Sequence, residues 1–279
     1  MRVIILAMDG LEYDFVLKWR LKALIQKVCG YVDVSEYYID EVGDILTTAV
    51  WASFITGKSL KEHGIRRLWV SRYKFIEDLR LKRDRIILYK LLRPVISAIA
   101  RKLRIVEPPT KRYLVRKGLT TIFDEYPSFV IEFPSYNESI NTRNKLIKAS
   151  RKGLDSYIKE VWNINRERIE GLIDALHNDN YAIYAVWLDI ADKVGHVYLP
   201  RKRILEVMKA YFWLNKVAYQ ISKILKDEDF MLIISDHGMN LDGTHSPRAF
   251  YSFSRNINLK PGRITEFKCI LEKVINEVR

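Results

Sequence analysis

The sequence of 279 residues contains only two cysteines, Cys29 and Cys269. Two cysteines cannot build a disulfide framework or a cysteine-rich zinc cluster, which favours an intracellular chain. The sequence also lacks an apolar run of about eighteen residues, which a transmembrane helix requires. Its amino-terminal apolar run stops at Asp9, too early for a signal peptide. We therefore expect a cytoplasmic protein.

The hydrophobic content is that of a folded protein. Hydrophobic residues make up 48% of the chain and aromatic residues 12%, which is more than disordered chains contain. A chain of this length can bury a substantial core. We expect one domain over residues 1–279.

Positive charge is concentrated in one segment. Residues 66–117 contain 17 Lys or Arg and 4 Asp or Glu, an excess of 13 that equals the net charge of the whole chain. Within 86–104, a basic stripe at helical spacing comprises Lys90, Arg93, Arg101 and Arg104. Such a stripe can contact an anionic membrane, attract phosphate compounds, or merely face solvent. Nucleic-acid binding is the less favoured partner, because no recognition motif accompanies the charge.

Apolar runs alternate with helical patterns along most of the chain. Strand-like runs occupy 3–8, 129–131, 181–188 and 230–234. Helical patterns are predicted at 11–27, 50–57, 140–150, 154–178, 201–226 and 263–277. Alternation of this kind predicts an α/β fold with a mainly parallel sheet and helices on both faces. Residues 66–128 interrupt the pattern and are predicted to form a basic helical insertion or cap.

Acidic residues stand where three of these strands end. Asp9 follows the first strand, Asp189 the third and Asp236 the fourth. Two histidines accompany them, His196 and His237, and His245 lies a few residues further on. Parallel strands end at one edge of a sheet, and ligands gather there. Asp and His suit zinc or manganese, although a single Asp at a strand end more often caps a turn.

A pair of threonines, Thr47 and Thr48, precedes a helical run that ends near Gly57. Threonine at a helix start is an ordinary N-cap. It can also be a nucleophile, because the amino-terminal end of a helix attracts phosphate.

These pieces together resemble a known family. The chain is similar to the alkaline phosphatase superfamily, nearest the type I phosphodiesterase/nucleotide pyrophosphatase group. The matching motifs occur in the family's order: Asp9-Gly10; Thr47-x-x-x-Trp51-x-Ser53-Phe54-x-Thr56-Gly57 with His63-Gly64-Ile65; Asp192-x-x-x-His196; Ser235-Asp236-His237-Gly238-Met239; and Gly243-Thr244-His245.

The resemblance implies a site with two divalent metal ions, Zn²⁺ or alternatively Mn²⁺. One ion would be held by Asp9, Thr47, Asp236 and His237, and the other by Asp192, His196 and His245. In the family motif, Thr47 rather than Thr48 takes the nucleophile's place. The implied route is attack by Thr47 on phosphorus, departure of an alcohol or phosphate, and hydrolysis of phospho-Thr47. The resemblance leaves Asp189 and His63 with structural roles.

The sequence departs from the family at one position. Many nucleotide pyrophosphatases have an Asn about twenty residues after the nucleophile, whereas this chain has Arg66 and Arg67 in that stretch. Either arginine, or Asn137 further on, could contact a phosphoryl oxygen instead. A solvated basic surface is an equally good interpretation of the arginines. The departure leaves the preference between monoesters and diesters open.

The sequence thus predicts a metal-dependent phosphoesterase acting on an anionic phosphodiester or pyrophosphate. A phosphomonoesterase of the same superfamily is the nearest alternative. The alternative from another class is a non-catalytic protein that grips membrane lipid or nucleic acid through its basic insertion.

Overall fold

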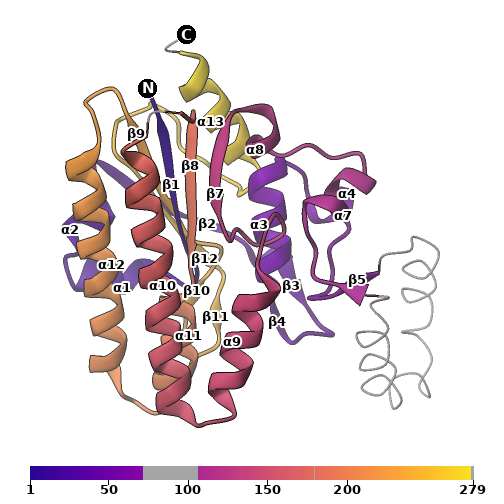
Figure 1. Cartoon of the computed structure of the whole chain (residues 1–279), viewed down its shortest axis with the longest axis vertical. Helices are drawn as coiled ribbons and strands as arrows, with labels where there is room; N and C mark the ends of the chain where they lie inside the picture. Colours follow the sequence, from indigo (N-terminus) through magenta and orange to yellow (C-terminus); the bar gives the residue numbers. More distant parts are fainter. Residues whose placement is uncertain (72–105, 179, 278–279) are drawn as a thin grey trace.

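A computed structural model describes residues 1–71, 106–178 and 180–277 of the chain (Figure 1). The basic stripe predicted within 86–104, with Lys90, Arg93, Arg101 and Arg104, lies outside the described residues. None of the helices in the described part of the chain has the length and hydrophobicity needed to cross a bilayer.

The centre of the molecule is a six-stranded sheet with the order β2-β12-β9-β1-β8-β7. Its strands are β1 (Val3–Met8), β2 (Val28–Asp33), β7 (Ser128–Ile131), β8 (Ile183–Leu188), β9 (Phe230–Ile234) and β12 (Arg248–Phe253). Strands β7, β8, β1 and β9 pair in parallel, and β12 runs antiparallel to both β9 and β2. The mainly parallel sheet predicted from the sequence is confirmed.

Helices cover both faces of this sheet, as predicted. One face packs against α1 (Tyr13–Lys18), α2 (Lys22–Ile25), α10 (Leu154–Leu176), α11 (Ile190–Tyr198) and α12 (Ile204–Ile224). The other packs against α3 (Thr47–Thr56), α4 (Leu60–His63), α7 (Lys111–Arg116), α8 (Ile122–Glu125) and α13 (Glu266–Asn276). Figure 1 shows the central strands between these two layers, with α9 (Ile140–Ser150) beside α10. The shorter strands form two-stranded sheets: β3 (Tyr38–Ile39) with β4 (Asp44–Ile45), β5 (Val70–Ser71) with β6 (Val106–Glu107), and β10 (Gly238–Met239) with β11 (His245–Ser246).

One predicted helix is wrong, and the helices α4 and α11 were not predicted. The helix expected over 11–27 is two short helices, because Arg20 (φ 53°) adopts a left-handed backbone between them and Gln26 (φ 55°) another at the end of α2. Helix α11 was not predicted, because the sequence there was interpreted only as a strand exit carrying ligands. Helix α3 begins at Thr47, three residues before the predicted start.

The register of the parallel strands places the site. Met8 pairs with Leu188, and Ala7 pairs with Ile234. Asp9, which follows Met8, therefore leaves the sheet at the same level as the residues that follow β8 and β9. The amide of Asp9 donates to the carbonyl of Leu188 (2.8 Å). This common exit brings side chains from distant parts of the sequence together.

Candidate metal centre

The end of β1 contacts the first turn of α11 through Gly10. Gly10 has φ +69°, and a Cβ at this position would lie 2.7 Å from the Cα of Asp192. The absence of a side chain lets the amide of Asp192 donate to the carbonyl of Asp9 (3.1 Å). Gly10 therefore allows Asp192 and Asp9 to lie side by side.

The loop after β9 is held by Glu12, which is buried. One carboxylate oxygen of Glu12 accepts from the amide of Met239 (3.0 Å), and the other accepts from Arg248 (2.8 Å). The hydroxyl of Ser235 donates to the carbonyl of His237 within the same loop. These contacts fix the direction of the Asp236-His237 pair, which the sheet alone would leave free to turn.

Three histidines face the site with the same ring nitrogen. In each of them Nδ1 lies within hydrogen-bond distance of a backbone carbonyl, which can only accept. The contacts are His196 to Gly243 (2.8 Å), His237 to Gly238 (2.9 Å) and His245 to Ile45 (3.1 Å). Nδ1 must then carry the proton, so that Nε2 presents a lone pair in the neutral ring. Such a partner for the second nitrogen is the usual arrangement around metal-ligating histidine.

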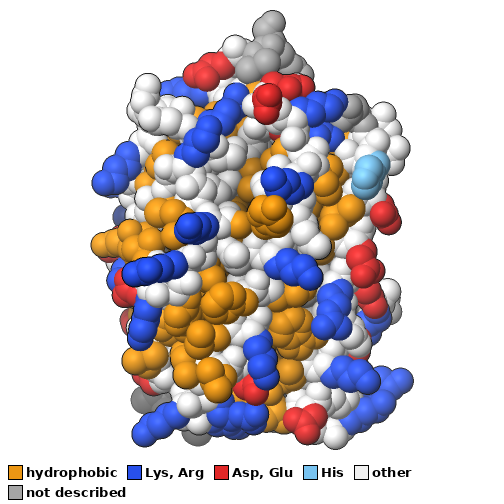
Figure 2. Space-filling model, turned by 90° about the vertical axis from the view of Figure 1, so that its left-hand side faces the viewer, with side chains coloured by type: hydrophobic (Ala, Val, Ile, Leu, Met, Phe, Trp, Pro, Cys, Tyr) orange, Lys and Arg blue, Asp and Glu red, His pale blue; other side chains and the backbone are white. Residues whose placement is uncertain are grey.

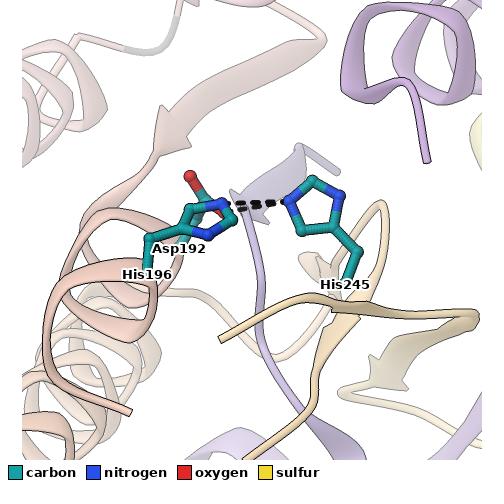
Figure 3. Close-up of side chains that lie close together, drawn as sticks. All are labelled: Asp192, His196 and His245. Atoms are coloured by element: carbon teal, nitrogen blue, oxygen red, sulfur yellow. Dashed lines mark hydrogen bonds and ion pairs between the residues drawn. The ribbon is translucent and has the colours of Figure 1, made fainter. Parts of the chain in front are cut away.

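The Nε2 atoms and the carboxylates meet at two neighbouring points. Asp192 and His196 project from α11, and His245, at the start of β11, faces them (Figure 3). Nε2 of His196 lies 2.9 Å from Asp192 Oδ1 and 3.0 Å from Nε2 of His245. Nε2 of His237 lies 3.2 Å from Asp9 Oδ1 and 3.3 Å from Asp236 Oδ2.

Among the described residues, two groups could each hold an ion: Asp192 with His196 and His245, and Asp9 with Asp192 and His237. Asp192 thus reaches both groups, whereas the resemblance assigns it to one.

Unpaired oxygens in the site fit a bound cation. Asp9 Oδ1, Asp192 Oδ1 and Asp236 Oδ2 are buried and accept no well-aligned hydrogen bond within the described ranges. The nitrogens nearest to them present lone pairs, which repel a carboxylate unless a proton or a cation lies between. Three buried carboxylates are costly to leave uncompensated. The donor set, aspartate oxygen with imidazole nitrogen, is one that Zn²⁺ or Mn²⁺ accepts.

The charges of the site shift its protonation strongly. Burial raises the pKa of Asp9 to about 8, and the neighbouring Asp236 and Asp192 add to the shift. Burial alone would lower the pKa of His237, but Asp236 and Asp9 outweigh it and raise that pKa to about 10. The residues by themselves therefore retain protons at neutral pH, at the positions that cations would occupy.

Thr47 stands at the start of α3 and faces these ligands. Its Oγ1 lies 3.4 Å from Nε2 of His237. The neighbouring Thr48 is 3% exposed, and its carbonyl accepts from Ser135 (2.7 Å). The two threonines therefore differ in position: the Thr47 hydroxyl faces the ligands, whereas Thr48 is buried and lines the adjoining pocket.

Lys193 and Asp44 also contact the site, and the sequence did not single them out. Nζ of Lys193 lies 2.7 Å from Asp192 Oδ2, the oxygen that faces away from the histidines. Burial disfavours the ammonium, but Asp192, Asp189 and Asp9 hold the pKa of Lys193 well above its usual range. Asp44 Oδ1 lies 3.1 Å from Nδ1 of His245. The position of Lys193 inside the Asp192–His196 motif was the only available signal.

A pocket of about 470 Å³ adjoins Thr47 and Asp9. Most of its walls are apolar, and its basic side chains are Arg143, Arg168 and Lys193. All three are already paired: Arg143 with Glu138 (2.7 Å), Arg168 with Glu132 (2.6 Å) and Lys193 with Asp192 (2.7 Å). The pocket is therefore suited to an organic group attached to a phosphoryl group at Thr47.

The predicted substrate contacts lie outside the lining of this pocket. Arg66 and Arg67 follow α4, and neither lines the pocket as described. The side-chain amide of Asn137 is engaged by backbone, accepting from Phe133 (2.7 Å) and donating to Val130 (2.8 Å). Contact of these three residues with a phosphoryl oxygen stays a prediction.

Asp189 and His63 have structural surroundings. Asp189 Oδ1 accepts from Asn165 (2.8 Å) and Arg168 (3.2 Å), which fixes the exit of β8. Nε2 of His63 lies 2.9 Å from the hydroxyl of Ser53, and its Nδ1 accepts from the amide of Ile65 (3.1 Å). These contacts agree with the structural interpretation of both residues.

Solved structures with a similar fold are distant in sequence. Murine ectonucleotide pyrophosphatase/phosphodiesterase 5 is 14% identical with a TM-score of 0.49, over 86% of this chain and 58% of that one. The PH0037 protein from Pyrococcus horikoshii is 11% identical with a TM-score of 0.47, over 99% and 96%. Phosphonoacetate hydrolase from Sinorhizobium meliloti is 12% identical with a TM-score of 0.46, over 86% and 57%. This chain thus spans little more than half of the murine protein and of the hydrolase.

No curated protein sequence matches the chain. The sequence model of the type I phosphodiesterase/nucleotide pyrophosphatase family matches residues 3–242, a range that includes the motif residues from Asp9 to His237. The chain belongs to the type I phosphodiesterase/nucleotide pyrophosphatase family.

Proposed function

We propose that this protein is a metal-dependent phosphoesterase that cleaves a phosphodiester or pyrophosphate bond with Thr47 as nucleophile. The observation that carries the proposal is the meeting of three imidazole Nε2 atoms and three unpaired carboxylate oxygens beside the Thr47 hydroxyl. Family membership supports the reaction class.

Two groups of residues would hold divalent ions. His196 and His245 would serve one ion, Asp9, Asp236 and His237 the other, and Asp192 lies within reach of both. Bound Zn²⁺ or Mn²⁺ would supply positive charge for the phosphoryl oxygens and for the Thr47 hydroxyl.

The chain's own residues would position and attack the substrate. Oγ1 of Thr47 forms a bond to phosphorus, the bond to the leaving oxygen breaks, and water then hydrolyses phospho-Thr47. The start of α3, a helix of 10 residues, presents its positive end to the phosphoryl group. Lys193 contributes by holding the second oxygen of Asp192, which keeps the first directed at the histidines.

The pocket beside Thr47 suits a substrate that carries an organic group. Its volume of about 470 Å³ and its apolar walls give room for an organic substituent. A monoester also carries one organic substituent, so the preference for a diester or pyrophosphate rests on the family.

A hydrolysis screen tests the proposal. The protein, stripped of metal and reloaded with Zn²⁺ or Mn²⁺, would be offered bis-p-nitrophenyl phosphate, p-nitrophenyl phosphate and nucleotides. We expect metal-dependent turnover with the diester preferred. Lack of turnover on every ester with either metal, in protein that binds the metal, would refute the proposed activity in favour of a binding protein.

A further inference from the structure

Helix α12 exposes a row of large apolar side chains. Leu205 is 68% exposed, Phe212 48% and Tyr219 55%. Because they are seven residues apart, they lie on one side of the helix and span about 21 Å. The opposite side, with Tyr211, Leu214 and other residues, is buried against the sheet. The helix is therefore apolar on two sides, and only one of them has a described partner within the chain.

A row of lysines runs beside this apolar row. Lys209, Lys216 and Lys223 each follow an apolar residue of the row by four positions, so each lies one turn further along the same side. Glu206 is the only acidic residue in α12, and it pairs with Lys209 (3.1 Å). The side that α12 exposes is thus apolar and positively charged. Figure 2 shows hydrophobic side chains in a band among Lys and Arg on this side of the molecule.

A basic hollow of about 660 Å³ opens at the carboxyl-terminal end of the apolar row. Tyr219 lines it, and its basic residues are Lys22, Lys27, Lys226 and Arg255. One of its two acidic residues, Asp229, is bound to Arg2 (2.6 Å). Nε of Arg255 is buried and has no hydrogen-bond partner in the described part of the chain. The hollow is thus suited to an anion at the end of an apolar surface.

We propose that α12 docks this protein on the surface of an anionic phospholipid bilayer. Leu205, Phe212 and Tyr219 would enter the boundary between headgroups and acyl chains, and the lysine row would contact anionic headgroups. The basic hollow accepts the phosphate of one lipid. A second copy docked on the same surface would bring two lysine rows together, which opposes self-association. The proposal concerns a surface outside the metal centre and holds whether or not the chain is an esterase.

Vesicle co-sedimentation of the full chain tests this surface. We expect binding to vesicles of phosphatidylcholine mixed with phosphatidylserine, and little binding to phosphatidylcholine alone. Replacing Lys209, Lys216 and Lys223 with Gln should weaken binding on the order of a hundredfold, since each surface lysine contributes about 1 kcal/mol. Leu205→Ser combined with Phe212→Ser and Tyr219→Ser should also release the protein. Circular dichroism would establish that both variants fold.

The matched control replaces three exposed lysines with Gln: Lys148 on α9, Lys159 on α10 and Lys152 in the turn between these helices. This variant should bind anionic vesicles like the parent. The proposal is overturned if the parent does not bind anionic vesicles, or if the control loses binding as much as the α12 lysine variant. It is equally overturned if the apolar variant keeps full binding, or if that variant instead disperses a dimer of the parent in sedimentation equilibrium.

Discussion

The Oγ1 of Thr47 lies 3.4 Å from Nε2 of His237, whereas its neighbour Thr48 is buried at the wall of the adjoining pocket. This difference supports the proposal of Thr47 as the nucleophile, which the family motif also selects. Thr47→Ala should lower turnover of a diester by a factor on the order of a thousand or more, because loss of a nucleophile removes the covalent route.

Thr48→Ala is the matched control for the nucleophile. It removes a buried hydroxyl but leaves the metal centre intact, so activity should stay within about tenfold of the parent. Thr48→Ala should bind as much metal as the parent and Thr47→Ala most of it, as measured by inductively coupled plasma mass spectrometry. The reverse ranking of the two variants would assign the nucleophile to Thr48.

Asp192 lies within reach of both groups of candidate ligands. Substituting it should therefore affect the binding of both ions. Asp192→Asn should reduce the metal bound per chain more than Asp236→Asn, because Asp236 adjoins only the group around His237. Ligand-binding linkage also predicts a change in stability. At a metal concentration about 100 times the dissociation constant, the parent should gain about 2.7 kcal/mol, and the Asp192 variant less.

Metal content after dialysis and thermal unfolding with and without Zn²⁺ check this prediction. Asp227→Asn serves as the control, since this exposed residue lies in the basic hollow and belongs to neither candidate ligand group. Equal metal content in the parent and in the Asp192 and Asp236 variants would contradict the ligand assignment.

Much of the fold could be predicted from the sequence, because the central strands of the sheet are buried on both faces. The residues of β1 and β9 are entirely buried, and strands of that kind appear as continuous apolar runs. Strands β2 and β12 escaped prediction for the opposite reason. Half-buried residues such as Cys29 and a polar Ser252 interrupt their apolar pattern. These two strands, at one edge of the sheet, therefore lack the continuous apolar pattern that would predict them.

Only those residues of the candidate site that belong to sequence motifs could be predicted. Asp9, Asp192 and His237 each belong to a motif, and the shared exit of parallel strands explains why they meet. Lys193 pairs with the adjacent Asp192, so its position inside the motif was the one local signal for it. Glu12 contacts Met239 and Arg248, which are far from it in the chain, and no local pattern encodes such contacts. Arg143 and Arg168 line the pocket for the same reason, since tertiary packing of α9 and α10 decides which basic residues face it.

The close contact at Gly10 predicts that adding one methyl group there lowers both stability and activity. A Cβ at position 10 would lie 2.7 Å from the Cα of Asp192, and the backbone there is left-handed. Gly10→Ala should force β1 and α11 apart, with a stability loss of about 1–3 kcal/mol and a larger loss of activity. Urea unfolding and diester hydrolysis check this expectation. Gly43→Ala is the control, since its backbone is also left-handed but its Cβ would meet open space. A Gly10 variant no more impaired than the Gly43 variant would show that the close approach is unimportant.

His63 gives the protein a stability that depends on pH. Burial lowers the pKa of His63 from 6.5 to about 4, with Arg66 acting in the same direction and Glu62 opposing it. The unfolded chain binds a proton near pH 6.5, whereas the folded chain binds it only near pH 4. Between these values the unfolded state holds more protons, so stability is full above about pH 6.5 and falls as the pH drops towards 4. The loss amounts to about 3 kcal/mol.

Comparing the parent with His63→Gln isolates this effect, because Gln cannot take up a proton but can still donate to Ser53. The free energy of unfolding in urea would be measured for both proteins from pH 7.5 to about pH 4. We expect the parent to lose more stability than the variant over this range, by about 3 kcal/mol. Parallel pH profiles of the two proteins would show that His63 titrates normally in the fold and that its burial against Ser53 does not govern acid stability.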